Sequence, residues 1–172
     1  MKRIFVTGVS GTGKTTIAHI LKSRGINSIS IDEEQGLCYW KNKVTGNIVD
    51  YEAVLDKEFI DKHDWVCDIT RLKSLIDSSS LPTVVLGIAT NQNDFLDLFD
   101  KIILLQCKPE TFIKRIMQRT DNDFGKDKSA QEYLLKTYKD FEEGLLRRGA
   151  RPINVDDPIE RVVELVMEEI DK

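Results

Sequence analysis

The segment RIFVTGVSGTGKTT, residues 3–16, joins a short apolar run to a glycine-rich turn. The run is Ile4 to Val6, and the turn carries Gly8, four intervening residues, then Gly13, Lys14 and Thr15. This spacing is the pattern of a phosphate-binding loop. Apolar residues at helical spacing follow it, so the segment predicts a buried strand, a phosphate-binding loop and a helix.

Each residue type in the loop has a physical reason. The glycines at 8, 11 and 13 let successive backbone N–H groups point at phosphate oxygens, and the helix N-terminus adds a positive dipole. Lys14 is expected to reach the β- and γ-phosphates, and the Thr15 hydroxyl is expected to hold Mg²⁺. The remaining predicted nucleotide-binding positions of the loop are Ser10, Gly11, Thr12 and Thr16.

Length and composition predict one cytoplasmic domain. The chain has 172 residues, a formal net charge of −4 and three widely spaced cysteines. The length suits a single domain over residues 1–172, and the acidic balance argues against a nucleic-acid or anionic-membrane partner. No signal sequence or long apolar run is present, and the cysteine spacing indicates free thiols in a reducing compartment.

Apolar runs predict the rest of the fold. Further strands are expected near 29–31, 83–89, 101–106 and 152–155, with helices between them. The continuous apolar runs are typical of parallel strands buried on both faces. The fold class is therefore α/β, with a five-stranded parallel sheet flanked by helices as three layers.

The acidic cluster after the second strand is a candidate catalytic feature. Asp32 and Glu34 would lie at the carboxyl end of a strand beside the phosphate loop. Asp32 is expected to bind Mg²⁺ or its waters, or to accept a proton from an attacking hydroxyl. A solvated acidic turn or a helix N-cap is the alternative for both residues.

Residues 33–68 leave the sheet pattern and are expected to bind the phosphoryl acceptor. Tyr39 and Trp40 either stack on a flat substrate or pack a small satellite core. A helix is expected over 51–62, capped by Asp50. Further along the chain, Asp68 is expected to cap a helix, and Arg71 either faces a ligand or lies at the surface.

Residues 119–129 are expected to form a short lid. Arg115 and Arg119 are four residues apart on one predicted helix face, at the base of a polar loop. A mobile polar loop with arginines at its base suits closure over phosphates, and a surface turn with solvated arginines is the alternative. The segment Ser129–Glu132 reads as a capping box for the next helix. Asn91 either caps a helix after the third strand or points at the γ-phosphate.

With these motifs placed, the chain resembles the P-loop kinases of nucleotides and small metabolites, such as nucleoside monophosphate, shikimate and gluconate kinases. The resemblance implies the strand order 2-3-1-4-5. It also implies that 33–68 binds the acceptor, that Arg115 packs on adenine and that Arg119 contacts phosphates. Asp32 resembles the carboxylate that follows the second strand of shikimate kinases.

Two departures from that family bear on the acceptor. Adenylate kinases carry Asp-Gly-x-Pro-Arg after the third strand, where this chain has Gly87-Ile-Ala-Thr-Asn91. The segment 33–68 contains lysines but no arginine, so no bidentate clamp for an acceptor phosphate is visible there. Both features favour a hydroxyl-bearing small molecule over a nucleoside monophosphate.

Three functions remain open at this point. The first is an ATP- and Mg²⁺-dependent kinase acting on a small acceptor, with Lys14, Asp32 and Arg119 as its catalytic residues. The second is a regulatory NTPase, although no glycine follows an aspartate by three residues as a GTPase switch requires. The third is a nucleotide-binding module without turnover.

Overall fold

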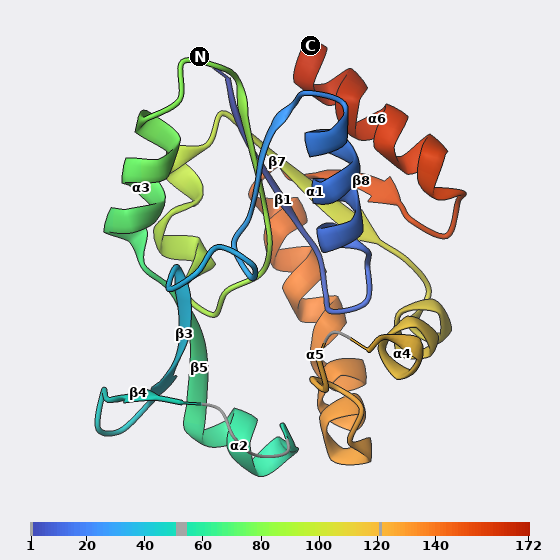
Figure 1. Cartoon of the computed structure of the whole chain (residues 1–172). Helices are drawn as coiled ribbons and strands as arrows, with labels where there is room; N and C mark the ends of the chain where they lie inside the picture. The colour runs from blue at the N-terminus through green and yellow to red at the C-terminus, as the bar shows by residue number, and fades with distance from the viewer. Residues whose placement is uncertain (1, 51–54, 121) are drawn as a thin grey trace.

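The computed structural model describes residues 2–50, 55–120 and 122–172. Its larger sheet has five parallel strands in the order β2-β6-β1-β7-β8 (Figure 1). These strands are β1 (Arg3–Thr7), β2 (Asn27–Ser30), β6 (Thr83–Leu86), β7 (Lys101–Gln106) and β8 (Arg151–Asn154). Numbered by themselves along the chain, they follow the order 2-3-1-4-5, which confirms the expected P-loop kinase fold.

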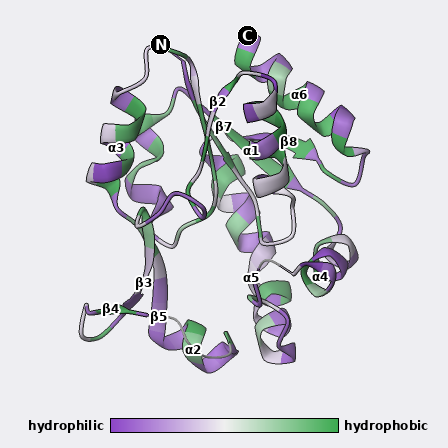
Figure 2. Ribbon diagram, viewed as in Figure 1, coloured by the Kyte–Doolittle hydropathy of each residue, from purple (hydrophilic) through white to green (hydrophobic). Residues whose placement is uncertain are grey.

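Helices cover both faces of this sheet because neighbouring strand residues point to opposite sides. In β1, Ile4 and Val6 belong to a core cluster with residues of α1 (Lys14–Ser23) and α6 (Ile159–Asp171). Phe5 lies between them in sequence and packs on the other face, with residues of α3 (Ile69–Asp77) and α5 (Lys128–Arg147). Green and purple alternate along α6 in Figure 2, as expected of a helix with one buried side.

The helices begin and end mostly where the sequence indicates. Gly25 follows α1 with a φ of 80°, and the Ile26 amide donates to the Leu21 carbonyl, as is typical of a glycine that ends a helix. Asp68 caps α3, as predicted, by accepting a bond from the Arg71 amide at 3.0 Å. Pro109 is the first residue of α4 (Pro109–Gln118), a position that suits proline.

Residues 38–67 contain a feature that the sequence analysis missed. Three antiparallel strands form a second sheet in the order β4-β3-β5, below the large sheet in Figure 1. They are β3 (Cys38–Asn42), β4 (Ile48–Val49) and β5 (His63–Cys67), with α2 (Lys57–Lys62) between the last two. The helix expected over 51–62 begins at Lys57 in the described residues, and positions 51–54 lie outside them. Its cap is Asp56, because that side chain accepts from the Phe59 amide at 2.8 Å, and the prediction of Asp50 was wrong.

Two other local predictions were wrong. Asn91 does not cap a helix, because the segment after β6 forms two 3-10 turns, Gln92–Asp94 and Leu96–Leu98. The cap of α5 is Asp127, whose carboxylate accepts from the Ser129 and Ala130 amides, so Ser129 is inside the helix and not its cap. An aspartate two residues upstream therefore replaces the expected capping box.

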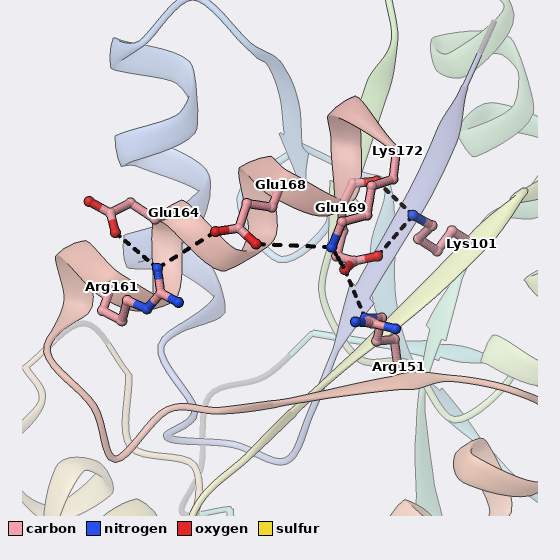
Figure 3. A network of polar contacts seen from close by, with 7 residues as sticks. All are labelled: Lys101, Arg151, Arg161, Glu164, Glu168, Glu169 and Lys172. Carbon is pink, nitrogen blue, oxygen red and sulfur yellow. Dashed lines mark hydrogen bonds and ion pairs between the residues drawn. The ribbon is translucent and has the colours of Figure 1, made fainter.

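The C-terminal helix is fixed to the sheet by a buried carboxylate. Glu169 of α6 pairs with Lys101 of β7 and Arg151 of β8, and with Lys172 on its own helix (Figure 3). Strand β8 forms one edge of the sheet and contains Pro152. Among the described residues, no helix combines the length and the apolar character needed to cross a membrane.

Candidate nucleotide and phosphoryl-transfer site

The loop between β1 and α1 has a backbone that only glycine fits at two positions. Gly11 and Gly13 have φ values of 86° and 87°, in the left-handed region that other residues avoid. A Cβ on Gly11 would also lie 2.6 Å from the Phe112 carbonyl oxygen, and one on Gly8 would lie 2.6 Å from the Leu105 oxygen. The loop is therefore pressed against the segment at the end of β7 and the start of α4.

Lys14, the first residue of α1, points back into this loop. Its Nζ donates to the carbonyl oxygens of Gly8 at 2.7 Å and Val9 at 3.0 Å. The ammonium is buried, and desolvation lowers its pKa to about 8, although nearby Asp32 acts to raise it and Arg119 to lower it further. The lysine predicted to bind phosphate is thus held inside the curl of the loop.

The other loop residues differ in their surroundings. Thr12 is buried, and its hydroxyl donates to the Val9 carbonyl at 2.8 Å, so it stiffens the loop. Ser10 is half-buried and accepts a hydrogen bond from Arg119, whereas Thr16, the third residue of α1, is exposed. Thr15 is half-buried in the first turn of α1.

The donor groups present fit a magnesium ion. A threonine hydroxyl and an aspartate carboxylate are hard oxygen ligands, and Mg²⁺ typically takes one or two such groups together with waters and phosphate oxygens. Among the described residues no cluster of three or more His, Cys, Asp or Glu side chains is placed to hold a metal.

Asp32 lies just beyond the end of β2. Its Oδ1 accepts a hydrogen bond from the Trp65 indole N–H at 3.0 Å. The residue as a whole is exposed, but neighbouring protein desolvates its carboxyl and raises its pKa, and Lys14, Trp65 and Arg119 oppose that shift. Asp32 and Lys14 therefore shift each other's pKa across the end of the sheet. The sequence analysis predicted that Asp32 would lie beside the phosphate-binding loop.

The two arginines expected at the base of the lid contact different parts of the site. Arg119 follows α4 and donates to the Ser10 hydroxyl at 3.0 Å and to the Phe124 carbonyl. Arg115 lies one turn earlier and donates to the Val155 carbonyl at 2.8 Å, just after β8. The polar loop 122–127 is thereby tied to the phosphate-binding loop through Arg119, and position 121 lies outside the described residues.

A cavity of about 490 Å³ opens at the carboxyl ends of β7 and β8. Asn154 and Asp156 line it, and they flank the Val155 carbonyl that Arg115 contacts. Glu142 of α5 also lines it, and burial raises the pKa of this carboxyl. The segment that begins at Asp156 thus borders an open volume.

Three candidates from the sequence have structural partners instead. The Asn91 side chain accepts from the Cys67 amide and donates to the Cys67 carbonyl, both at 2.9 Å, so it joins β5 to the end of β6. Glu34 and Arg71 face each other with a nitrogen to oxygen distance of 3.8 Å. Hydrogen bonds and ion pairs between such distant residues cannot be predicted from the sequence.

Trp65 is the residue that sequence reasoning overlooked. Nothing in the local sequence pattern marks its ring nitrogen as part of a site. Its proximity to Asp32 depends on the pairing of β3 with β5, which places Trp65 opposite Trp40. Thr7 and Gln92 form a second unexpected contact, a buried hydrogen bond of 3.2 Å at the end of β1.

Comparison with known proteins gives a family and a fold. A family model described as an AAA domain matches residues 4–135. A protein of Methanocaldococcus jannaschii, provisionally assigned as an adenylate kinase, is 30% identical over 118 residues, which are 68% of this chain and 58% of that protein. The chain thus spans little more than half the length of this relative.

Solved structures of kinases share the fold at low sequence identity. Deoxyadenosine kinase from M. mycoides with bound dATP aligns with a TM-score of 0.57, 16% identity and full coverage of both chains. Shikimate kinase from Bacteroides thetaiotaomicron gives 0.61 and 14%, with 99% of each chain covered. A gluconokinase from Sinorhizobium meliloti gives 0.56 and 19%, covering 99% of this chain and 91% of that one. All of these proteins are named as kinases, which are phosphotransferases.

Proposed function

The chain belongs to the AAA domain family matched over residues 4–135, and we propose that it is a kinase which transfers the γ-phosphoryl group of ATP to a small acceptor. The observation that carries the proposal is that Lys14 and Arg119, from distant segments, both hydrogen-bond residues of the phosphate-binding loop, with Asp32 close enough to affect the pKa of Lys14. A cation inside a phosphate-binding loop, a carboxylate and an arginine are the parts that phosphoryl transfer needs.

On the nucleotide side, the loop amides and Lys14 bind the phosphates. The Lys14 ammonium exchanges the carbonyl oxygens of Gly8 and Val9 for phosphate oxygens, which are better partners for a buried cation. Thr15 would hold Mg²⁺ directly and Asp32 would hold one of the waters on the ion, and the ion would neutralise charge on the phosphates. Arg119, already beside Ser10 of the loop, stabilises charge on the transferred group.

On the acceptor side, Asp32 accepts the proton of the attacking hydroxyl. Its raised pKa brings a carboxylate closer to the operating pH, which improves proton transfer to it. Lys14 and Arg119 favour the ionised form of the carboxyl, which is the form able to accept a proton.

The acceptor itself is proposed to bind over the small sheet formed within 33–68. Its aromatic side chains Trp40 and Trp65 are adjacent, with ring centroids 5.3 Å apart. Since the segment has no arginine, a hydroxyl-bearing metabolite such as a nucleoside, a sugar or a sugar acid suits it better than a monophosphate. Residues 119–129 are proposed to close over the phosphates as a lid.

The domain is further proposed to work as one unit in the cytoplasm, without a nucleic-acid or membrane partner. The support is a net charge of −4 and three cysteines, Cys38, Cys67 and Cys107, that are all free thiols. Free thiols suit a reducing compartment.

A direct assay tests the kinase proposal. Purified protein with ATP and Mg²⁺ is incubated with nucleosides, nucleoside monophosphates, sugars, sugar acids and shikimate, and acceptor-dependent ADP formation is measured. We expect turnover with at least one hydroxyl acceptor and a loss of at least about a hundredfold in Lys14→Ala, whose fold stays intact by circular dichroism. Phosphate release at a rate that does not depend on any acceptor would instead indicate a regulatory NTPase. Full activity in Lys14→Ala would refute the assignment of the site.

The variant Asp32→Asn distinguishes a role in accepting the proton from a role in binding ATP. If Asp32 accepts the proton, the variant loses turnover by far more than it loses ATP affinity. Equal turnover in the variant and the natural protein would assign Asp32 a structural role only.

A further inference from the structure

The indole of Trp65 reaches Asp32 from a different sheet. Trp65 lies on β5 of the small antiparallel sheet, whereas Asp32 follows β2 of the large parallel sheet, 33 residues earlier in the chain. Its Nε1–H donates to Asp32 Oδ1 at 3.0 Å, within normal hydrogen-bond geometry. An indole N–H is only a donor, so this contact favours the carboxylate and orients it.

Contacts on both sides hold the indole in place. The Trp65 carbonyl accepts from the Thr90 amide at 2.7 Å, which ties this point of β5 to the loop after β6. Trp65 is paired with Trp40 across the sheet, and the Trp40 ring packs edge-on against Phe59 of α2 with centroids 5.1 Å apart. The N–H is therefore presented by a packed aromatic group and not by a loose surface side chain.

We propose that Trp65 is a positioning residue for phosphoryl transfer, whose N–H holds Asp32 oriented toward the acceptor and couples the acceptor-binding sheet to that carboxylate. This inference rests on the proposed function of Asp32 and adds a residue that no sequence motif marks. One carboxylate oxygen is fixed by the indole, and the other is left for the hydroxyl proton. A shift of the small sheet on acceptor binding would thus move the proton acceptor with it.

The charges around Asp32 define what loss of the bond would do. Lys14 and Arg119 favour the ionised carboxyl, while burial and Glu33 disfavour it, and the Cys38 thiol also lies within its electrostatic influence. The Trp65 bond acts on the same side as the two cations. Without the bond, the carboxylate loses a donor that fixes its direction, while both cations still act on it.

A fluorescence measurement tests the contact without any assay of activity. Trp40 and Trp65 are the two tryptophans of the chain, so Trp40→Phe leaves Trp65 as the sole indole. We expect the emission of Trp65 at neutral pH to change when Asp32→Ala is added to Trp40→Phe, because the indole N–H loses its acceptor. Emission that is the same with and without Asp32 would overturn the proposal.

Kinetics then test the positioning role. Trp65→Phe keeps an aromatic ring but removes the donor, and we expect kcat to fall about tenfold, the value of one hydrogen bond to a charged group, with the KM for ATP unchanged. Trp40→Phe disturbs the same packing but keeps the donor, so we expect its kcat to fall less than that of Trp65→Phe. Equal losses of kcat in both variants, or an unchanged kcat in Trp65→Phe, would contradict the inference.

The two experiments separate the inference from the proposed function. If the Asp32-dependent fluorescence change is present but no acceptor is phosphorylated, the kinase proposal fails and the positioning role fails with it, while the contact itself stands. If an acceptor is phosphorylated but Trp65→Phe matches the natural protein, only the role of Trp65 is refuted.

Discussion

At the scale of one residue, Lys14 shows that burying a cation for phosphate binding disfavours its charged form. The ammonium is buried among backbone carbonyls, and desolvation lowers its pKa to about 8. A lysine in water titrates near 10.4, so the folded, ligand-free protein gives up this proton at a much lower pH than the unfolded chain does. Phosphate oxygens supply negative charge that favours the protonated form of Lys14.

We therefore predict that ATP binding weakens above pH 8. Below its pKa Lys14 is already charged, whereas above it a proton must be taken up when the phosphates bind. Between pH 8 and 9 the association constant should fall about fivefold. Calorimetry in buffers of different ionisation enthalpy measures both the affinity and the proton uptake. A constant affinity up to pH 10 with no proton uptake would contradict the assignment.

The two arginines provide a paired prediction. Arg119 touches the phosphate-binding loop and Arg115 touches the backbone after β8, so their truncation should affect different constants. Arg119→Ala is expected to lower kcat by about 10³-fold with a smaller change in ATP affinity. Arg115→Ala is expected mainly to raise the KM for ATP. Steady-state kinetics with varied ATP measure kcat and KM for both variants. A kcat effect in Arg115→Ala and a KM effect in Arg119→Ala would exchange the two roles.

Residues whose role depends on local spacing could be predicted from the sequence. The geometry of the loop at Gly11 and Gly13 and the cap at Asp68 follow from neighbours a few positions away. Trp65 and Asn91 could not be predicted, because their partners are 33 and 24 residues distant and are set by the pairing of β3 with β5. Side-chain contacts between two sheets produce no periodic pattern in the sequence.

At the scale of elements, a buried carboxylate adds polar contacts to the apolar packing that attaches α6 to the sheet. Glu169 is buried beside Lys101, Arg151 and Lys172, and these hydrogen bonds and charges lower its pKa to about 2 (Figure 3). A carboxyl whose pKa is lower in the folded than in the unfolded state stabilises the fold above pH 4.5 and ceases to do so as the pH falls toward 2.

We predict that Glu169→Gln lowers the free energy of unfolding by about 1–2 kcal/mol at pH 7, a value reduced for the solvent exposure of Arg151 and Lys172. The difference from the natural protein should shrink between pH 5 and pH 2. Glu168→Gln is the matched control, since Glu168 is half exposed on the same helix and contacts Arg161 and Lys172. Urea unfolding at several pH values measures both, and an equal loss in the two variants would show that the buried network has no special role.

Among the elements, long apolar runs were easier to predict than short mixed ones. The five core strands and the ends of α1 and α3 follow from hydrophobic runs, glycines and an aspartate cap. The strands of the small sheet are partly exposed on both faces and mix charged with aromatic residues, so they lack the period of two that indicates a strand. At α5, Asp127 and Ser129 both have capping side chains, and only the backbone path decides between them.

At the scale of the whole molecule, the site is assembled where strands β1, β2 and β6 end side by side. Parallel pairing places these ends at one edge of the sheet, so Lys14, Asp32 and the loop after β6 meet there. The five-strand fold was predictable, but its strand order came from the family resemblance and not from the residues. The acceptor was not predictable at either level, because fold alone does not specify a substrate.

This arrangement predicts that nucleotide stabilises the entire fold. ATP with Mg²⁺ at a hundred times its dissociation constant should raise the free energy of unfolding by about 2.7 kcal/mol, because the unfolded chain has no site. Thermal unfolding with and without ligand measures the effect, and Lys14→Ala is the control that should not respond. An unchanged midpoint in the natural protein would exclude tight ATP binding.

The position of Pro152 in the edge strand β8 affects how copies of this protein meet one another. An exposed strand edge offers unpaired amides to any other extended chain, which is a common route to aggregation. Proline has no amide hydrogen to offer, and Pro152 lies on β8 opposite Leu104 of β7. The outer border of the sheet is thereby a poor template for a sixth strand, which protects a crowded solution of this protein from end-to-end polymers.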